Sequence, residues 1–309
     1  MLTVSNSNFS YKDKSTLKDI NFKLEKGTNL ALIGESGCGK STLLKIIYGL
    51  YDLDEGEIFW NDQQVLGPKH HLVPGMPFMK YLAQDFDLMP FITVAENVGK
   101  YLSNFYPEEK QERIIELLEV VEMTDFANEK VKYLSGGQMQ RVALAKVLAL
   151  EPELLLLDEP FSHIDNFLKN SLRRKIFKYL KEKEITCIVA THDANDILSF
   201  SDEVLVLRNG TIIDVGETRE IYSYPGSFYV ASLFGEVNEI KWEDNVLYVY
   251  PHQLEVSENS TFEVVVKETY FRGNNYLVEA IFNNQIVFFE SRYDIPVQRI
   301  VGLQIKIDL

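Results

Sequence analysis

The segment GESGCGKST, residues 34–42, constrains the fold of this chain more than any other stretch. It matches the pattern G-x-x-x-x-G-K-[S/T], and it follows the apolar run LALI, which predicts a buried strand at 30–33. A predicted helix over about 40–48 comes directly after it. Glycines let the backbone curl so that successive amides face an anion, and the helix N-terminus adds partial positive charge. The segment therefore predicts a loop that holds nucleotide phosphates between a strand and a helix.

Two side chains of this loop have specific predicted roles. Lys40 is expected to reach the β- and γ-phosphates, and the Ser41 hydroxyl is expected to ligate Mg²⁺. The flanking strand and helix disfavour the alternative, a glycine-rich turn that binds nothing. The loop amides would lower the pKa of the Cys38 thiol, but a small space-filling side chain is the simpler interpretation, and no redox role is predicted. The other residues expected to contact the nucleotide are Gly34, Ser36, Gly37, Cys38, Gly39 and Thr42.

A second segment, LLLLDEP at 154–160, supplies two adjacent carboxylates after four apolar residues. Carboxylates at the end of a buried strand are costly unless a cation uses them. We expect Asp158 to hold Mg²⁺ and Glu159 to polarise the attacking water. The alternative is a strand that ends in a solvated acidic turn before Pro160, which a phosphate loop in the same chain disfavours. The two segments together predict a nucleotide hydrolase.

Strands and helices alternate around these two segments. Apolar runs at 154–157 and 186–190 predict buried strands, and the amphipathic stretch 166–183 predicts a helix between them. Strands that alternate with helices indicate a parallel sheet covered on both faces. The fold class expected for this part of the chain is therefore α/β.

Two further regions belong to the same predicted domain. Residues 1–33 predict strands and turns, and residues 56–66 predict a hairpin with its turn at 61–62. Residues 86–150 are expected to be largely helical, with one helix beginning at the proline of 107 and running to about 121.

After about residue 234 the pattern of alternating strands and helices gives way to short β-rich runs. Turn signals at 272–275 and 283–284 separate several short β-rich runs, which predict a small closed or half-open barrel similar to an OB fold. We place the domain boundary at 235, which gives domains 1–235 and 236–309. The predicted strands are NVLYVY, TFEVVVKETYF, YLVEAIF, QIVFFE and LQIKI.

Composition excludes several classes of function. The formal net charge of −15 disfavours a nucleic-acid partner, because phosphodiester backbones are repelled. Two cysteines cannot build a disulfide framework, and a reducing compartment is expected. The N-terminus does not resemble a secretory signal, and no apolar run reaches the length of about 18 residues that a spanning helix needs. We therefore expect a cytoplasmic protein whose membrane role, if any, depends on a partner.

The segment YLSGGQMQR, residues 133–141, places a second set of backbone amides at the start of a predicted helix. LSGGQ upstream of LLLLDEP resembles the signature of ATP-binding cassette (ABC) ATPases, and the likeness covers roughly residues 1–230. The signature residues are Ser135, Gly136, Gly137 and Gln138. The resemblance assigns four further roles: adenine stacking to Tyr11, contact with Mg²⁺ and water to Gln84, the D-loop to Asp165 and γ-phosphate contact to His192. Two positions depart from the family pattern, namely His163 in the D-loop and Lys146 in place of an arginine.

The resemblance implies ATP and Mg²⁺ as cofactors, with Ser41, Gln84 and Asp158 as metal ligands. It implies an ABC cassette with a mixed sheet core, an N-terminal antiparallel β subdomain and a helical subdomain at about 86–150. In such cassettes the signature segment completes the nucleotide site of a facing copy. A head-to-tail homodimer with two sandwiched ATP molecules is therefore expected.

Three functions remain open. DFDLMPFITVAENV, which follows Gln84, resembles importer ATPases, and the tail around Gly235 and Asn238 resembles a TOBE domain. These likenesses imply import of ferric iron, sulfate, a polyamine or a sugar through integral membrane permease subunits, with a solute-binding protein. The chain would then lie peripherally on the inner face of the membrane. The alternatives are an exporter ATPase with a sugar-binding tail and a soluble ABC ATPase that acts on ribosomes or DNA.

Overall fold

The computed structural model describes residues 1–12, 14–242, 245–260 and 262–306. The chain divides into two compact units, Met1–Arg219 and Glu220–Leu309. Helix α7 (Thr218–Ser223) spans this division, and helix α8 (Phe228–Ser232) lies in the second unit. The second unit therefore begins ahead of the predicted boundary at 235, although its strands begin only after that boundary.

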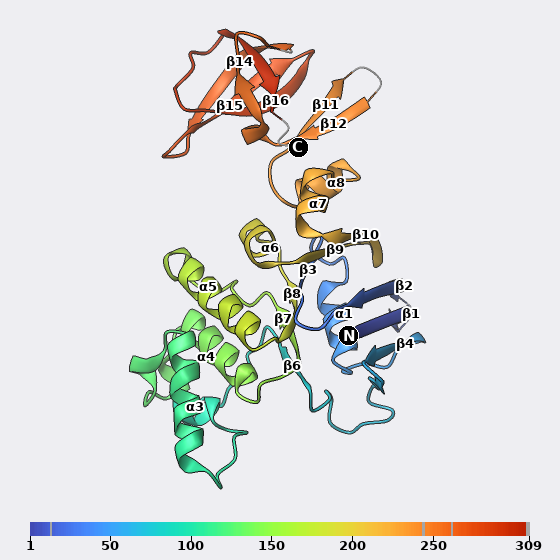
Figure 1. Cartoon of the computed structure of the whole chain (residues 1–309), viewed down its shortest axis with the longest axis vertical. Coiled ribbons are helices and arrows are strands. Elements are labelled where there is room, and N and C mark those ends of the chain that lie inside the picture. The colour runs from blue at the N-terminus through green and yellow to red at the C-terminus, as the bar shows by residue number, and fades with distance from the viewer. Residues whose placement is uncertain (13, 243–244, 261, 307–309) are drawn as a thin grey trace. The chain divides into compact units, whose positions relative to one another are not determined.

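A six-stranded mixed sheet forms the centre of the first unit (Figure 1). Its strand order is β10-β9-β3-β8-β7-β6, and only β10 runs antiparallel to its neighbour. Every residue of β3, β7 and β8 is buried, as expected for strands covered on both faces. The strands are β3 (Asn29–Ile33), β6 (Met79–Leu82), β7 (Leu154–Asp158), β8 (Thr186–Ala190), β9 (Glu203–Arg208) and β10 (Thr211–Glu217).

Two hydrophobic cores lie on opposite faces of this sheet. Side chains alternate along a strand, so Leu155 and Leu157 pack with residues of α4 and α5, whereas Leu154 and Leu156 pack with α1 and the N-terminal strands. This arrangement confirms the predicted α/β class with a covered sheet. The helices are α1 (Lys40–Ile47), α4 (Gly136–Leu148), α5 (Asn166–Glu182) and α6 (Ala194–Phe200).

An antiparallel sheet with the order β2-β1-β4-β5 forms the N-terminal subdomain. The predicted hairpin at 56–66 is confirmed, because Trp60 pairs with Gln63 across the turn. The Trp60 ring is 2% exposed, and its Nε1 donates to Glu153 Oε2 at 3.2 Å, which fixes this sheet to the start of β7. The strands are β1 (Leu2–Tyr11), β2 (Lys14–Leu24), β4 (Glu55–Trp60) and β5 (Gln63–Gln64).

The region between β6 and β7 is largely helical, as predicted. Helix α3 begins at Pro107, a residue that favours the first helical turn, and buries Ile114, Leu117 and Leu118 while Ile115 faces solvent. The elements are α2 (Val94–Val98), α3 (Pro107–Val120), α4 and the 3₁₀ turns η1 (Thr124–Phe126) and η2 (Val131–Tyr133).

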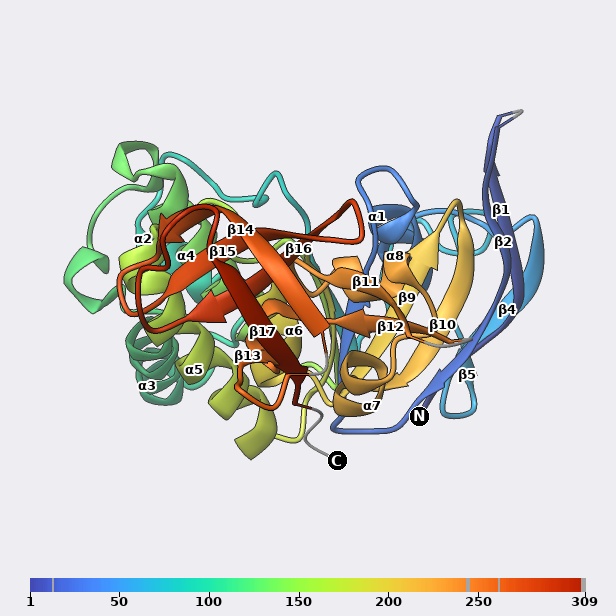
Figure 2. The same ribbon diagram turned by 90° about the horizontal axis from the view of Figure 1, so that it is seen from above.

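The second unit contains a β-hairpin and a curled five-stranded sheet (Figure 2). The sheet order is β13-β17-β14-β15-β16, and the edge strands β13 and β16 approach each other, which agrees with a half-open barrel. Thr261 and Ile307, which end two of the predicted strands, lie outside the described residues. The elements are β11 (Asn238–Trp242), β12 (Asn245–Val249), η3 (Pro251–Gln253), β13 (Leu254–Val256), β14 (Phe262–Phe271), β15 (Tyr276–Phe282), β16 (Gln285–Ser291) and β17 (Ile300–Ile305).

Candidate functional site

The predicted phosphate loop lies between β3 and α1, at the end of the sheet where the parallel strands finish. Gly34 has φ 147°, and a Cβ there would lie 2.1 Å from the carbonyl oxygen of Leu207, so only glycine fits. Ser36 and Gly37 form an exposed crest. The ammonium of Lys40 donates to the carbonyl oxygens of Gly34 at 2.7 Å and Glu35 at 3.0 Å. Lys40 therefore lies over the loop, where phosphate oxygens can replace these two acceptors.

Cys38 is 4% exposed, and burial raises the pKa of its thiol although the neighbouring Lys40 opposes that shift. Backbone amides of the loop also oppose the rise in the thiol pKa, but burial outweighs them, which favours the space-filling interpretation of Cys38. The second cysteine, Cys187, is fully buried in β8, and burial raises its thiol pKa as well.

The predicted metal ligands Ser41 and Asp158 lie together. The Ser41 hydroxyl donates to Asp158 Oδ1 at 3.0 Å, and Tyr81 donates from its hydroxyl to Asp158 Oδ2 at 3.3 Å. Asp158 is 4% exposed, and burial raises the pKa of its carboxyl while the hydrogen bonds from Ser41 and Tyr81 oppose that shift. Hydroxyl and carboxylate oxygens are the hard ligands that Mg²⁺ prefers, so the pair fits this ion.

Protein ligands are few at this position. Within the described ranges, no group of three or more His, Cys, Asp and Glu side chains could hold a metal. Mg²⁺ is usually held by one or two protein side chains together with substrate phosphates and water, so a sparse protein ligand set suits a nucleotide-bound ion.

Sequence reasoning missed Tyr81. The residue lies on β6, which pairs in parallel with β7, and Tyr81 is opposite Leu156 in the register. Burial raises the pKa of its phenol, and the neighbouring carboxylate of Asp158 raises it further. The only sequence signal was its place in the strand that leads to Gln84, which does not reveal a contact with a residue so far along the chain.

Glu159 and His192 also lie together. His192 Nδ1 is 3.2 Å from Glu159 Oε1, and the Glu159 amide donates to the carbonyl of Ala190 at 2.9 Å, which extends the pairing of β7 with β8. Glu159 has φ 49°, in the left-handed region that few residues other than glycine adopt. The structure thus brings together the carboxylate expected to polarise water and the histidine expected to contact the γ-phosphate.

A buried arginine supports the loop that carries His192. Arg173 on α5 is 2% exposed, donates a hydrogen bond to Asp193 and forms an ion pair with Asp196 at 2.5 Å. Burial acts to raise the pKa of Asp193, but the hydrogen bond from Arg173 outweighs it and holds this pKa below its usual value. At Asp196 burial prevails and raises the pKa, although Thr191 donates to it at 2.7 Å. These contacts tie α5 to residues 191–196.

Tyr11 lies beside the phosphate loop, as its predicted adenine contact requires. Its ring meets those of Phe9 and Tyr51 edge-on, with centroids 4.8 and 5.4 Å away, and Thr42 donates to its hydroxyl at 3.5 Å. Tyr11 is 39% exposed, which leaves part of the ring open to a base. The ring cluster holds Tyr11 in place, so that an incoming base meets a fixed surface.

Gln84 is a predicted metal ligand that the structure does not bring into contact with Ser41 and Asp158. It is exposed in the turn after β6 and makes no hydrogen bond among the residues described. The turn is fastened further along, because Lys146 on α4 donates to the backbone carbonyl of Asp87 and pairs with its carboxylate at 2.9 Å. The Lys146 position, a departure from the family pattern, therefore links α4 to this turn.

The LSGGQ segment forms the N-terminal cap of α4. Ser135 Oγ accepts from the Gln138 amide at 3.3 Å, and Gln138 Oε1 accepts from the Ser135 amide at 2.8 Å, which is a capping box. Gly136 has open space around it, whereas a Cβ on Gly137 would lie 2.7 Å from the carbonyl oxygen of His163. Ser135 and Gly136 are exposed, so this helix N-terminus faces outward and is ready for an anion.

The D-loop leads from Glu159 into α5. Asp165 is the N-terminal flanking residue of that helix and is exposed. His163 departs from the small residue expected there, and its ring meets that of Phe86 edge-on with centroids 5.5 Å apart. Its Nδ1 also lies 3.1 Å from Ser162 Oγ.

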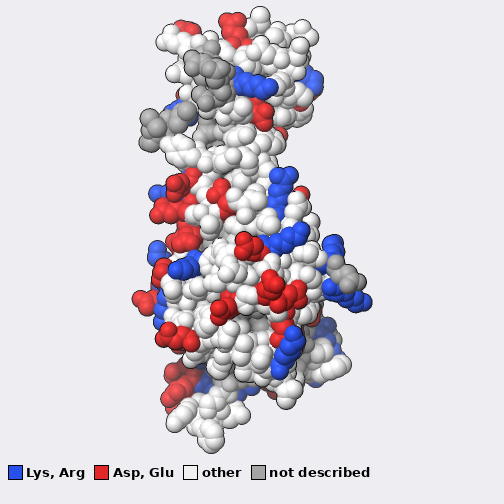
Figure 3. Space-filling view, turned by 90° about the vertical axis from the view of Figure 1, so that its right-hand side faces the viewer, with Lys and Arg blue, Asp and Glu red and all other residues white. Residues whose placement is uncertain are grey.

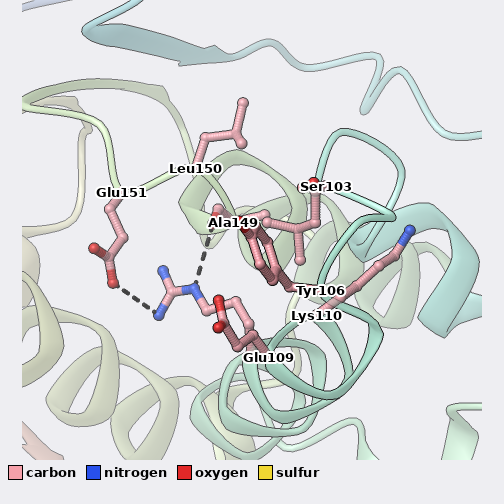
Figure 4. A pocket seen from close by; sticks show the side chains of 9 residues that line it. Ser103, Tyr106, Glu109, Lys110, Ala149, Leu150 and Glu151 are labelled. Atoms are coloured by element: carbon pink, nitrogen blue, oxygen red, sulfur yellow. Dashed lines mark hydrogen bonds and ion pairs between the residues drawn. The ribbon is translucent and has the colours of Figure 1, made fainter.

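A cavity of about 350 Å³ lies in the helical region (Figure 4). Arg113, one of the lining residues, donates to the carbonyls of Leu148 at 2.8 Å and Ala149 at 3.3 Å, which caps the C-terminus of α4. Tyr106 and Leu150 at the cavity are 62% and 44% exposed. The lining residues are Leu102, Ser103, Tyr106, Glu109, Lys110, Arg113, Ala149, Leu150 and Glu151.

Comparison with known proteins places this site in a family. A family model described as ABC transporter matches residues 17–162. The sulfate/thiosulfate import ATP-binding protein CysA of Synechocystis sp. is 35% identical over 85% of this chain and 74% of that protein. The spermidine/putrescine import ATP-binding protein PotA of Roseobacter denitrificans is 38% identical over 77% of this chain and 65% of that protein. The Fe(3+) ions import ATP-binding protein FbpC 2 of Haemophilus influenzae is 34% identical over 76% of this chain and 67% of that protein.

The fold agrees with a solved ATP-binding cassette. A dimeric post-hydrolysis state of a cassette bound to ADP and Pi superposes with a TM-score of 0.63 at 30% identity, covering 71% of this chain and 99% of that chain. The likeness confirms the predicted cassette architecture and ATP hydrolysis as the reaction of this site. Relatives at this identity and coverage establish that the chain belongs to the ATP-binding subunits of the ABC transporter family.

Proposed function

We propose that this ATPase powers an importer of a small solute or ion, of the ferric iron, sulfate, polyamine or sugar class. The observation that carries this proposal is the import role in the names of three relatives that each match more than three quarters of the chain. Those relatives act on different solutes, so the proposal extends to the class of transport and not to one cargo.

The nucleotide site supports a hydrolytic mechanism in which residues of one chain bind the phosphates, hold the metal ion and activate the water. Lys40 binds the phosphates, and Ser41 and Asp158 would hold Mg²⁺, which neutralises charge on them. Glu159 orients the attacking water and takes its proton, with His192 beside it at 3.2 Å to contact the γ-phosphate. Gln84 remains a proposed third ligand, and it would have to move with its turn to reach the ion.

The second half of each site would come from another copy of the chain. Ser135, Gly136 and the N-terminus of α4 present donors outward, where the γ-phosphate of an ATP held by a facing subunit can accept them. Driving an open–closed equilibrium from 1:99 to 99:1 takes about 5.5 kcal/mol, so each of two ATP molecules would supply roughly 2.7 kcal/mol. A few charge-assisted hydrogen bonds between each ATP and the facing subunit are sufficient to supply this free energy. Hydrolysis would then remove the link and let the halves part.

The cavity at Arg113 is the proposed docking place for a membrane permease subunit. Among the described residues, no helix is long and apolar enough to cross a bilayer. Tyr106, which lines the cavity, is 62% exposed, and the same stretch of chain exposes the rings of Tyr101 and Phe105 at 54% and 92%. A cavity lined by both apolar and charged side chains suits a short amphipathic helix from a partner protein.

These contacts would hold the chain on the cytoplasmic face of the membrane, where a solute-binding protein delivers cargo to the permease from the other side. A nucleic-acid partner is disfavoured. On the face drawn in Figure 3, basic and acidic side chains are interspersed and form no basic band that could follow a phosphodiester backbone. We propose residues 236–309 as a TOBE-like domain that stabilises the dimer.

Copurification from membranes tests this proposal. The full chain, extracted in mild detergent, should retain an integral membrane protein. Leu150→Arg should lose that protein while it keeps its own ATPase activity, because Leu150 lies at the cavity and outside the nucleotide site. Val215→Arg on β10 is the matched control at 46% exposure, against 44% for Leu150. Recovery of ribosomal or DNA-bound complexes in place of a membrane protein would contradict the proposal.

A further inference from the structure

The catalytic loop that begins at Glu159 is held by a side chain from the signature helix. Gln140 lies on α4, five positions after the Ser135 cap, and is 2% exposed. Its Nε2 donates to the carbonyl oxygen of Glu159 at 3.0 Å and is 3.4 Å from Ser162 Oγ. Its Oε1 accepts from the His163 amide at 3.0 Å. Both the nitrogen and the oxygen of the Gln140 side-chain amide therefore form hydrogen bonds with the segment 159–163.

This contact acts on a backbone conformation that local sequence disfavours. Glu159 has φ 49°, and the residue after it is Pro160, which by itself pushes the preceding residue toward extended conformations. The Glu159 carbonyl also accepts from Ser162, from its amide at 3.2 Å and its hydroxyl at 3.0 Å. The Ser162 bonds belong to the turn itself, whereas Gln140 is the donor that reaches this carbonyl from another element.

The contact between α4 and residues 159–163 is also close at the first turn of the helix. A Cβ on Gly137 would lie 2.7 Å from the carbonyl oxygen of His163, so the first turn of α4 and the catalytic loop touch through their backbones. A shift of α4 therefore cannot leave residues 159–163 unmoved, since interiors at this density transmit displacement.

We infer that Gln140 is a positioning residue that fixes the catalytic carboxylate of Glu159 to the signature helix of the same chain. Through it, the helix that senses one ATP holds the carboxylate that acts on the other. This inference rests on the proposed head-to-tail dimer, in which α4 serves the nucleotide of the facing subunit. It assigns no contact between Gln140 and the nucleotide.

Two variants of the full chain test the role. Gln140→Met keeps the length of the side chain but removes its hydrogen bonds to Glu159, Ser162 and His163. Gln140→Glu keeps the acceptor for His163 while it removes the donor to Glu159. Both should lower kcat by about tenfold or more. The KM and the affinity for ATP measured without metal should stay within about twofold, since the phosphate loop is untouched. Gln111→Glu, on the exposed face of α3, is the matched control and should leave both values unchanged.

Two results of this first test would overturn the inference. An unchanged kcat in both Gln140 variants would do so, as would a loss of ATP affinity equal to the loss of rate. A Glu159→Gln/Gln140→Met double variant should still dimerise with ATP, and failure to do so while Glu159→Gln alone dimerises would show that Gln140 acts on assembly. Failure of Glu159→Gln itself to dimerise would instead count against the proposed function.

Mixed dimers separate an effect on the carboxylate of the same chain from an effect on the facing site. A Gln140→Met chain paired with a Ser135→Arg chain retains one site whose carboxylate and signature are both intact, so it should hydrolyse as fast as wild type paired with Ser135→Arg. A Gln140→Met chain paired with a Glu159→Gln chain should be slower than wild type paired with Glu159→Gln, by about tenfold. The reverse pattern would place the effect in the facing site and overturn the inference.

Discussion

Tyr81 and Ser41 donate to opposite oxygens of the same carboxylate, so that Asp158 is held from both sides before any ion binds. The Ser41 bond is 3.0 Å long and the Tyr81 bond 3.3 Å. A carboxylate fixed in this way loses little freedom when it turns to a metal-bound water or ion, which favours binding.

Removing the Tyr81 hydroxyl should weaken Mg²⁺ binding without affecting the nucleotide alone. Tyr81→Phe deletes one hydrogen bond of about 1 kcal/mol, so the Mg²⁺ concentration for half-maximal hydrolysis should rise about fivefold. ATP affinity in EDTA should not change, and Mn²⁺ binding in the presence of ATP, followed by electron paramagnetic resonance, should weaken to the same extent. Tyr224→Phe, at a 64% exposed position, is the control. Equal metal dependence in both variants would exclude this role for Tyr81.

The parts of the fold that the sequence predicted are those with a local signal. Three such features are the glycine pattern of 34–42, the mostly apolar and fully buried strands β3, β7 and β8, and the start of α3 at Pro107. All depend on neighbours in the chain, and all were predicted within a residue or two. The predicted helix 166–183 ends at Glu182. The ABC architecture followed from the order of motifs, which resemblance supplied.

The parts that the sequence did not predict depend on contacts between distant residues. Only the packed sheet brings such pairs together. One is Gln140 with Glu159, and another is Arg173 with the carboxylates of Asp193 and Asp196. Contacts between distant residues also place α7 and α8 largely in the second unit, while the predicted domain boundary at 235 stays a prediction. Tyr222 stacks on Tyr250 with centroids 4.5 Å apart, which attaches α7 to the β-rich region.

Glu159→Gln should abolish turnover and trap a dimer. The amide cannot take the proton of the attacking water, so hydrolysis should fall by about 10²–10⁴-fold while the phosphate loop still binds ATP. Size-exclusion chromatography with ATP should then show a species twice the size of the chain, which disappears when Lys40→Ala is added. A monomer in saturating ATP would count strongly against the sandwich.

Ser135→Arg should stop hydrolysis while ATP binding persists. The residue is exposed at the cap of α4, and among the described residues its side chain bonds within its own helix and not with the phosphate loop, so the defect would lie in the facing site. We expect a loss of about 100-fold or more, similar to removal of donors that stabilise transition-state charge. Ser227→Arg, which removes the serine cap of α8, is the matched control and should turn over normally. Normal turnover in Ser135→Arg would refute the shared site.

Asp158→Asn should stabilise the metal-free protein at neutral pH. Burial raises the pKa of Asp158 above the unfolded value of about 3.9, so the folded state binds more protons and the free energy of unfolding falls as pH rises through the folded pKa. Asparagine avoids that loss. In EDTA at pH 7 its Tm should exceed that of wild type by about 2–4 °C for each 1 kcal/mol gained, with the difference vanishing below about pH 3.9. A lower Tm for the variant at pH 7 would contradict the burial argument.

Arg173→Met should destabilise the first unit strongly, because it leaves the carboxylates of Asp193 and Asp196 without their buried cation. Breaking a buried ion pair from one side costs about 3–5 kcal/mol, and the urea midpoint should fall accordingly. Arg174→Met is the matched control, since that neighbour on α5 is exposed, and its cost should stay within about 0.5 kcal/mol.

The deficit of Arg173→Met should shrink in acid. Burial already raises the pKa of Asp196, and a carboxyl whose folded pKa is raised contributes stability below the unfolded pKa of about 3.9 and loses it as pH rises. Arg173 opposes the rise in the Asp196 pKa, so its loss raises that pKa further. The variant then folds at little cost when Asp196 is protonated, but it must bury an unpaired charge when Asp196 is ionised. Urea unfolding of wild type and variant at about pH 4 and pH 7 measures this difference. A deficit that is the same at both pH values would place the cost in lost packing against Phe161, whose ring centroid lies 5.6 Å from the guanidinium, and not in the unpaired charge.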